Sequence, residues 1–134
     1  MLTLALHTPS GTQKLDNVDE VILPAKGGEI AILPHHAPLM TELSSGTIEV
    51  KQGKETHHFV SFDGFAQITD SVVSIFSAGI ERANDLNEAE IQKAIDRAQA
   101  TLSETKEEGN ISAITINLER EMAKLKTIRR RHQK

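Results

Sequence analysis

The stretch "IEVKQGKETHHFV", residues 48–60, has the pattern of a β-hairpin. Apolar and polar residues alternate on both sides of Gln52-Gly53-Lys54, and alternation places every second side chain on the same face of a strand. The same period of two begins at Leu2 and continues to about Ile80, with turn residues at short intervals between the runs. We therefore predict short antiparallel strands that form a sandwich or a flattened barrel.

The apolar period changes to three and four after Asn84, in a tract rich in Ala, Glu, Gln and Lys that is typical of helices. Asn87 suits the N-cap position, and Glu90, three residues later, suits the reciprocal bond of a capping box. Leu86 and Ile91 have the spacing of a hydrophobic staple. The apolar stripe of this first predicted helix consists of Ile91, Ile95, Ala98 and Leu102.

A turn is predicted at Gly109 or Asn110, where either residue can adopt the left-handed conformation that ends a helix. Ser112 then caps a second helix. Its apolar stripe consists of Ile114, Leu118, Met122, Leu125 and Ile128. Because the two stripes can face each other, we predict an α+β chain with a β unit over residues 1–83 and an antiparallel αα-hairpin over residues 84–134.

The predicted hairpin is too small to be stable through its own apolar contacts. Full burial of a large apolar side chain contributes roughly 1.5–3 kcal/mol, whereas ordering each residue costs about 1.5 kcal/mol. The few large apolar side chains of the two stripes therefore leave no surplus. We expect the order of the hairpin to depend on the surface against which it docks, which is typical of an element that can occupy two positions.

Charge separates the two predicted helices. Residues 84–111 contain seven acidic and three basic residues, whereas residues 112–134 contain seven basic and two acidic ones. The formal net charge of −4 and the lack of Trp and Tyr argue against binding to nucleic acid. The chain contains no Cys, which excludes thiol chemistry, and no run of about eighteen apolar residues, so we expect membrane association only through a partner protein.

Two pairs of adjacent histidines, His35-His36 and His57-His58, are candidates for a metal site or for proton transfer. Adjacent residues on a strand point to opposite faces, so such a pair seldom binds one ion. The sequence also lacks the glycine motifs that bind nucleotides and the strained serine motif of hydrolases. Two classes of protein remain: a non-catalytic β module with a movable helical arm, and a small β-barrel enzyme or metal-binding protein that uses these four histidines.

The stretch "GGEIAILPHHAPL", residues 27–39, resembles the G-E-L-G-I-L-P-G-H-A-P-L signature of the ε subunit of F-type ATP synthases. Further similarity lies in "HTPSGT" at 7–12, "DGFAQI" at 63–68 and "ERANDL" at 81–86. The resemblance implies a flattened β-sandwich of about ten strands, mounted on the rotor with the γ subunit and the ring of c subunits. It also implies a C-terminal hairpin that can fold down or extend upward.

The same resemblance implies two sets of partner-binding residues. Those expected to contact the c ring or the γ subunit are Gly28, Glu29, His36, Ala37 and Pro38. Those expected to contact the α and β subunits of the catalytic head are Lys124, Lys126, Arg129, Arg130 and Arg131. His35 occupies a position at which the family usually has glycine.

Several bacterial members of this family have the ATP-binding signature [I/L]-D-x-x-R-A at the start of the hairpin. The matching positions here include Leu86, Asn87, Glu90 and Ile91, so both charged positions are changed. Because Glu90 would repel a polyphosphate where arginine would attract it, we expect weak ATP binding or none. No catalytic residue, metal or cofactor is expected.

The resemblance therefore implies a non-catalytic ε subunit of the central stalk. Such a subunit couples proton translocation by the c ring to ATP synthesis and restrains ATP hydrolysis through its hairpin. Its expected location is peripheral, on the cytoplasmic face of the bacterial membrane or on the stromal face of the thylakoid.

Overall fold

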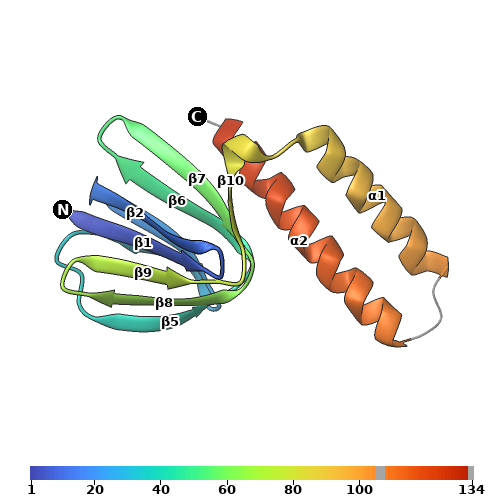
Figure 1. Cartoon of the computed structure of the whole chain (residues 1–134), viewed down its shortest axis with the longest axis horizontal. Helices are drawn as coiled ribbons and strands as arrows, with labels where there is room; N and C mark the ends of the chain where they lie inside the picture. Colours follow the sequence, from blue (N-terminus) through green and yellow to red (C-terminus); the bar gives the residue numbers. More distant parts are fainter. Residues whose placement is uncertain (105–107, 133–134) are drawn as a thin grey trace.

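The structure is a computed structural model that describes residues 1–104 and 108–132. Figure 1 shows a β-sandwich beside two antiparallel helices, with the C-terminal end of the second helix close to the junction between the two parts. The predicted α+β architecture, a sandwich followed by an αα-hairpin, is confirmed.

Ten strands, joined into one continuous sheet, form the two layers of the sandwich. One layer has the order β10-β7-β6-β3, with β4 also paired to β3, and the other has the order β5-β8-β9-β1-β2. The layers connect where Ala25 of β3 pairs with Leu43 of β5. Neighbouring strands are antiparallel except for β1 and β9, which are parallel. The strands are β1 (Leu2–Thr8), β2 (Gly11–Val18), β3 (Glu20–Ala25), β4 (Gly28–Ile32), β5 (Leu39–Leu43), β6 (Gly46–Gln52), β7 (Glu55–Ser61), β8 (Gly64–Thr69), β9 (Val72–Phe76) and β10 (Ile80–Arg82).

The core of the sandwich consists of the apolar side chains that alternate along these strands. Leu2, Leu4 and Leu6 of β1 are all buried, as their period of two predicts. Ile48 and Val50 of β6 are buried in the same cluster. Both layers contribute to this core, so the sandwich is complete without side chains from the helices.

The predicted hairpin at residues 48–60 is confirmed as the antiparallel pair β6–β7, in which Ile48 lies opposite Phe59. Gly53 occupies its turn with a positive φ of 61°. A second glycine is required at the start of β8. Gly64 has a φ of +146°, and a Cβ atom there would lie 2.1 Å from the carbonyl oxygen of Phe76.

The hairpin consists of α1 (Glu88–Glu104) and α2 (Glu108–His132), which follow a short 3-10 turn, η1 (Ala83–Asp85). The predicted N-cap is confirmed, because the backbone N–H of Glu90 donates to Oδ1 of Asn87 at 3.1 Å. Leu86 packs against the cluster that contains Ile91, as the staple predicts. Among the described residues, no helix combines the length and the apolar composition that crossing a membrane requires.

The predicted start of the second helix is wrong. Helix α2 begins at Glu108, so Gly109, Asn110 and Ser112 lie inside it, and none of them is its turn or cap. Gly and Asn cost at most about 1 kcal/mol relative to Ala in a helix, a cost that a longer helix can offset. Ile111 also becomes half-buried in this longer helix. Residues 105–107, between the helices, lie outside the described part of the chain.

The predicted apolar stripe of α2 is correct at Leu118, Leu125 and Ile128, which pack against α1, but not at Met122. Met122 is 45% exposed, and its neighbour Ala123 is buried instead. The reason is that α2 contacts α1 with one face and the sandwich with another. A single stripe therefore does not describe which of its residues are buried.

Candidate functional site: the junction between sandwich and hairpin

Helix α2 lies against the outer face of β6 and β7. The hydroxyl of Thr127 is 2.7 Å from that of Thr47 on β6, and both residues are buried. Ala123, one turn earlier, packs against Val60 and Phe62. This contact explains why β6 has four consecutive buried residues, 47–50, although one face of a two-layer sandwich is normally exposed.

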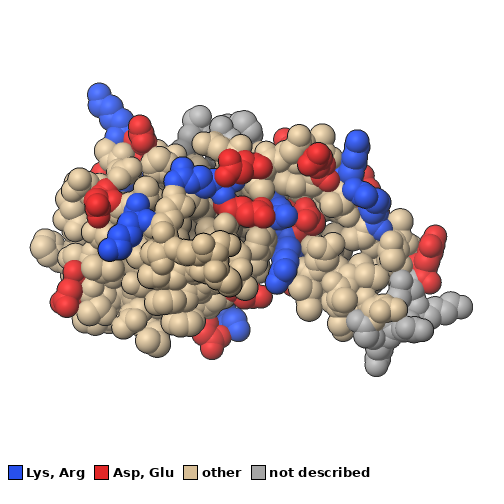
Figure 2. All heavy atoms as spheres, viewed as in Figure 1, with Lys and Arg blue, Asp and Glu red and all other residues tan. Residues whose placement is uncertain are grey.

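Arg130, close to the end of α2, contacts two carboxylates of the sandwich. Its guanidinium donates to the Glu29 carboxylate on β4 through Nη1 and, at 3.5 Å, through Nη2. The same Nη2 atom donates to Oε2 of Glu49 on β6 at 3.1 Å. The hydrogen bond to Glu29, with the charges of both carboxylates, raises the pKa of Arg130 against the opposing effect of burial. Figure 2 shows acidic and basic side chains side by side where the sandwich meets the hairpin.

Glu49 is the most buried member of this cluster. Its side chain is 4% exposed, whereas that of Glu29 is 51% exposed. His58, its register partner on β7, places Nε2 3.5 Å from Oε1 of Glu49 and is equally buried. A carboxylate in such a place needs charged or hydrogen-bonding partners. The sequence analysis named His58 only as one of a histidine pair, and no motif identified Glu49, because the burial of both residues depends on the position of α2.

Lys124 lies on the opposite side of the contact between α2 and the sandwich from Arg130. Its ammonium lies 3.2 Å from Glu121 and 3.7 Å from Glu81, the latter on β10. It also lies 5.6 Å from the centre of the Phe62 ring, a distance that allows a cation–π interaction. Arg120, one turn earlier, lies 5.5 Å from the same ring. These contacts add polar links between α2 and the sandwich.

The other predicted head-binding residues point elsewhere. Arg129 is exposed and lies 3.9 Å from Glu88 of α1. Lys126 is exposed and lines a groove of about 710 Å³ between α2 and the sandwich, together with Arg130 and Glu29. The side chain of Arg131 lies outside the described part of the structure. Within that part, the basic residues of α2 therefore form separate contacts and not one patch.

The predicted rotor-docking residues lie at both ends of β4. Gly28 and Glu29 begin the strand, and the positive φ of Gly28, 128°, favours glycine. His36, Ala37 and Pro38 are exposed in the loop after its last residue. At roughly 3.3 Å per strand residue, about 10 Å of strand separates the two groups. The first group adjoins the described part of the hairpin, through the contact between Glu29 and Arg130.

The histidine pairs do not converge. His35 is exposed with a left-handed φ of 68°, a conformation that glycine adopts more readily than other residues. His36 contacts the Ala37 carbonyl through Nδ1 at 2.6 Å. His57 lies near Gln52 and Glu55, on the opposite face of β7 from His58. The described residues contain no group of three or more His, Asp or Glu side chains that could hold a metal ion.

The positions that match the ATP signature surround the first turn of α1. Leu86 and Ile91 belong to the hairpin core, and Asn87 caps the helix. Glu90 is exposed and lines a hollow of about 600 Å³. The charged residues that line this hollow are Glu81, Asp85, Glu90, Lys93, Arg97, Glu121 and Lys124, of which four are acidic and three are basic.

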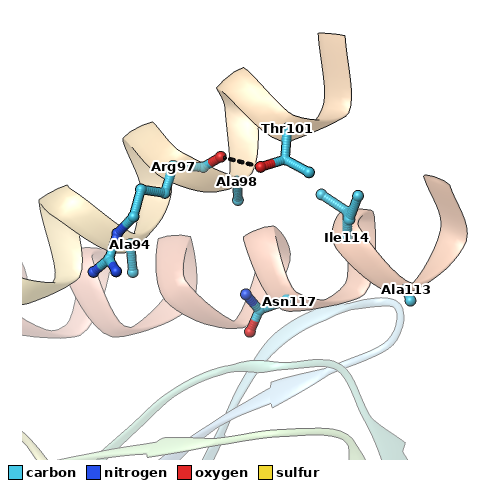
Figure 3. A pocket seen from close by; sticks show the side chains of 7 residues that line it. All are labelled: Ala94, Arg97, Ala98, Thr101, Ala113, Ile114 and Asn117. Atoms are coloured by element: carbon cyan, nitrogen blue, oxygen red, sulfur yellow. Dashed lines mark hydrogen bonds between the residues drawn. The ribbon is translucent and has the colours of Figure 1, made fainter. Parts of the chain in front are cut away.

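A groove of about 470 Å³ separates α1 from α2 toward the end of the hairpin that lies away from the sandwich (Figure 3). Small side chains create it, namely Ala94 and Ala98 of α1 and Ala113 of α2. Thr101 donates to the Arg97 carbonyl at 2.9 Å, so its hydroxyl is used within α1. The two helices are therefore packed loosely at this end.

An aromatic ladder crosses the outer face of the second layer of the sandwich. The rings of Phe65 and Phe76 are 4.9 Å apart, and those of Phe76 and His7 are 4.5 Å apart, both stacked. Phe65 is 42% exposed. The sequence analysis did not identify this surface, because the three residues come from three strands that only the sheet pairing brings together.

The fold and the junction define a class of protein: a β-sandwich that carries a helical hairpin through polar contacts. Residues 1–83 match the family described as ATP synthase, Delta/Epsilon chain, beta-sandwich domain. The ATP synthase epsilon chain of Dehalococcoides mccartyi is 36% identical over 133 residues, which cover 98% of this chain and 95% of that protein. The chloroplastic epsilon chain of Adiantum capillus-veneris is 34% identical, with 92% of each chain covered.

The chain therefore belongs to the family of ATP synthase epsilon chains. The resemblance inferred from the sequence is confirmed. The fold agrees as well: a chain in the solved mitochondrial ATP synthase of Euglena gracilis superposes with a TM-score of 0.79 at 23% identity, over 91% of this chain and 78% of that chain.

Proposed function

We propose that this chain couples proton translocation by the c ring to ATP synthesis and restrains ATP hydrolysis with its hairpin as a movable arm. Its family membership makes it a subunit of ATP synthase. The observation that carries the regulatory part is the construction of the junction. Helix α2 meets the sandwich through a threonine pair, an alanine and charged contacts, so release of the hairpin leaves the sandwich core intact.

The inhibitory role is tested by removing residues 112–134 from the chain and measuring ATP hydrolysis by the assembled enzyme. We expect hydrolysis to increase, because the truncated chain cannot extend α2 toward the catalytic head. Assembly is checked by co-purification of the truncated chain with the γ subunit. An unchanged rate in a fully assembled enzyme would show that the hairpin is not an inhibitor.

We propose that Glu29 and its neighbours Gly28, His36, Ala37 and Pro38 contact the c ring or the γ subunit. Glu29 is half-exposed, so it can pair with a basic or amide group of a partner. Glu29→Lys should weaken association and lower proton pumping driven by ATP. Because Glu29 also contacts Arg130, the substitution is best made in the chain without residues 112–134. Glu55→Lys, at another exposed carboxylate, is the matched control.

We propose that Lys124, Lys126, Arg129, Arg130 and Arg131 offer positive charge to an acidic segment of the catalytic head when the hairpin extends. Lys126 and Arg129 are already exposed in the docked state. The attraction between complementary charges is screened by salt. Inhibition should therefore weaken as ionic strength rises, which steady-state hydrolysis at increasing salt concentrations measures against the truncated enzyme.

We propose that the isolated chain has no physiologically useful affinity for ATP. The acidic residues that line the hollow beside Glu90 outnumber the basic ones, which disfavours a polyphosphate. Calorimetric titration with ATP should show no binding at micromolar concentrations. A dissociation constant in that range would contradict the proposal.

We also propose a peripheral location on the cytoplasmic face of a bacterial membrane or on the stromal face of the thylakoid. In either place the chain is attached through the γ subunit and the c ring. Washing membranes with low-salt buffer that contains a chelator, a treatment that detaches peripheral proteins, should release it together with the catalytic head.

A further inference from the structure

We propose that Arg130 is a latch that holds the hairpin on the sandwich, and that it therefore opposes the extended state. The latch consists of the Arg130 guanidinium on α2 and of its two acceptors on the sandwich, Glu49 and Glu29. The proposal rests on the movable arm described under the proposed function. It adds the residues that decide how often the arm is released.

Glu49 is the acceptor that makes the latch selective for the docked state. Its carboxylate is almost fully buried where β6 meets α2, and Arg130 of α2 donates a hydrogen bond to it. Hydrogen bonds that involve a charged group contribute more to stability than hydrogen bonds between neutral groups. Glu29 adds a second, more exposed contact, which water and salt weaken.

The geometry predicts an asymmetric response to substitution. Removal of the guanidinium alone leaves the Glu49 carboxylate enclosed beneath α2 without that donor, and the docked state then carries the cost of a buried charge. Release of α2 hydrates Glu49 and removes this cost. Arg130→Ala should therefore favour release, and a second substitution, Glu49→Gln, should restore part of the docking because it removes the buried charge. His58, on the sandwich, stays beside Glu49 in both states.

Arg129 provides a matched control on the same turn of the same helix. Its side chain is 63% exposed and lies 3.9 Å from Glu88, a residue of the hairpin itself. Arg129→Ala removes the same charge and changes the helix propensity equally, but it leaves every contact between α2 and the sandwich in place. The two substitutions together separate the latch from a general effect of positive charge on α2.

The chain contains no Cys, so a single reporter cysteine can measure release of the hairpin in the full-length protein. Thr127 lies on the face of α2 that meets β6 and is fully buried in the docked state, so a Thr127→Cys thiol reacts with a disulfide reagent only when the hairpin opens. When closing is faster than labelling, the labelling rate is proportional to the open fraction. All variants carry this reporter, and the urea midpoint of each confirms that the sandwich remains folded.

We expect Arg130→Ala to increase the labelling rate about 10- to 100-fold, the ratio that corresponds to the loss of charged hydrogen bonds. Arg129→Ala should change the rate less than about twofold, as expected for an exposed charge. Arg130→Ala combined with Glu49→Gln should label several times more slowly than Arg130→Ala alone. Equal rates for the two arginine variants, or no slowing in the double variant, would overturn the latch.

Hydrolysis by the assembled enzyme then separates the latch from the inhibitory arm. Because Arg130 is also proposed to meet the catalytic head, hydrolysis by Arg130→Ala is compared with hydrolysis by Arg130→Ala combined with Glu49→Gln, which lacks the same head contact. If both proposals hold, the double variant hydrolyses ATP faster, because its hairpin is released less often. Faster labelling without any change in hydrolysis, in an enzyme that also ignores removal of residues 112–134, would support the latch and contradict the inhibitory arm. Equal hydrolysis by these two variants, despite their different labelling rates, would also support the latch and would show that the released hairpin does not inhibit.

Discussion

The sandwich and the hairpin differ in how each obtains its stability. Among the described residues, the sandwich core contains fifteen buried apolar side chains from both layers, whereas the hairpin core contains four. The hairpin core lies toward the junction, and the opposite end of the hairpin has a groove between small side chains. We therefore expect the sandwich to fold without the hairpin, and the hairpin to depend on its contact with the sandwich.

This difference fits the proposed function, in which the hairpin moves while the sandwich stays in place. An element with few buried apolar contacts opens at a low free energy, whereas the core of a sandwich opens only on global unfolding. Most of the contacts that hold α2 are polar, so water can replace them when the hairpin leaves, and the apolar part is the small cluster of Ala123 with Val60 and Phe62. Under the proposed function, the same molecule thus combines a rigid platform with an arm of adjustable position.

The largest expected effect is that of Leu23→Ala in the sandwich. Leu23 is fully buried in β3, so its truncation removes apolar burial and leaves a cavity, at a cost of about 2–5 kcal/mol. Urea unfolding should show a much lower midpoint with an unchanged slope. Leu33→Ala, at a side chain that is 52% exposed, is the control and should have little effect. Similar midpoints for the two variants would contradict the assignment of the core.

A smaller effect on global stability is expected for Ile95→Ala in the hairpin. Ile95 belongs to the hairpin core between α1 and α2 and not to the core of the sandwich. Hydrogen exchange of the amides in both helices should accelerate by a factor of about 10 or more, from the cost of a buried truncation. The exchange of the β1 amides should stay the same. Equal acceleration in both parts would show that they unfold as one unit.

Asn87→Ala should have an effect confined to the first turn of α1. The substitution removes the acceptor for the Glu90 N–H, which typically costs about 1 kcal/mol. Amide exchange of the first turn should therefore accelerate about fivefold. Gln99→Ala, at an exposed position within the same helix, serves as the reference. The N-cap assignment fails if both variants behave alike.

The smallest expected effect is that of Glu42→Gln on the surface of the sandwich. Lys26 is 2.8 Å from Glu42, and this hydrogen bond, with the Lys26 charge, lowers the pKa of Glu42. The lowered pKa of Glu42 stabilises the folded protein at pH values above the usual carboxyl pKa. This contribution is lost as the pH falls through the pKa that Glu42 has in the folded state. The Lys26 pKa is raised, so its contribution is lost as the pH rises through that value.

Both side chains of this pair are mostly exposed, so the difference between the wild type and Glu42→Gln should be barely measurable at pH 7. Thermal unfolding at pH 7 and below about pH 3, where carboxyl groups are protonated, checks the sign. The small difference should vanish at the low pH. A difference that grows as the pH falls would contradict the direction of the shift.

The sequence predicted the features that depend on neighbouring residues. The alternation of Leu2, Leu4 and Leu6 predicted the inner face of β1, because the inner face of a strand meets the core whatever the strand order. Asn87 predicted the start of α1, since its bond to Glu90 spans three residues. The signature at residues 27–39 predicted the family, which the comparisons confirm.

Predictions from local patterns were wrong where two local arrangements of the chain differ little in free energy. Ser112 is a suitable cap, but the first turn of α2 at Glu108 allows a longer helix that half-buries Ile111. Met122 fits the stripe that faces α1, but the sandwich requires Ala123 on a different face. In each case a contact with another element decided between alternatives that differ little in free energy.

The sequence by itself determined the two-part architecture, the inner faces of the strands and the family. Only the tertiary structure decided that Glu49 and His58 are buried and that Arg130 contacts Glu29 across 101 positions of the chain. The physical reason is one of range. Periodicity and caps act between residues a few positions apart, whereas the outer face of β6 becomes interior only because α2 folds back to cover it.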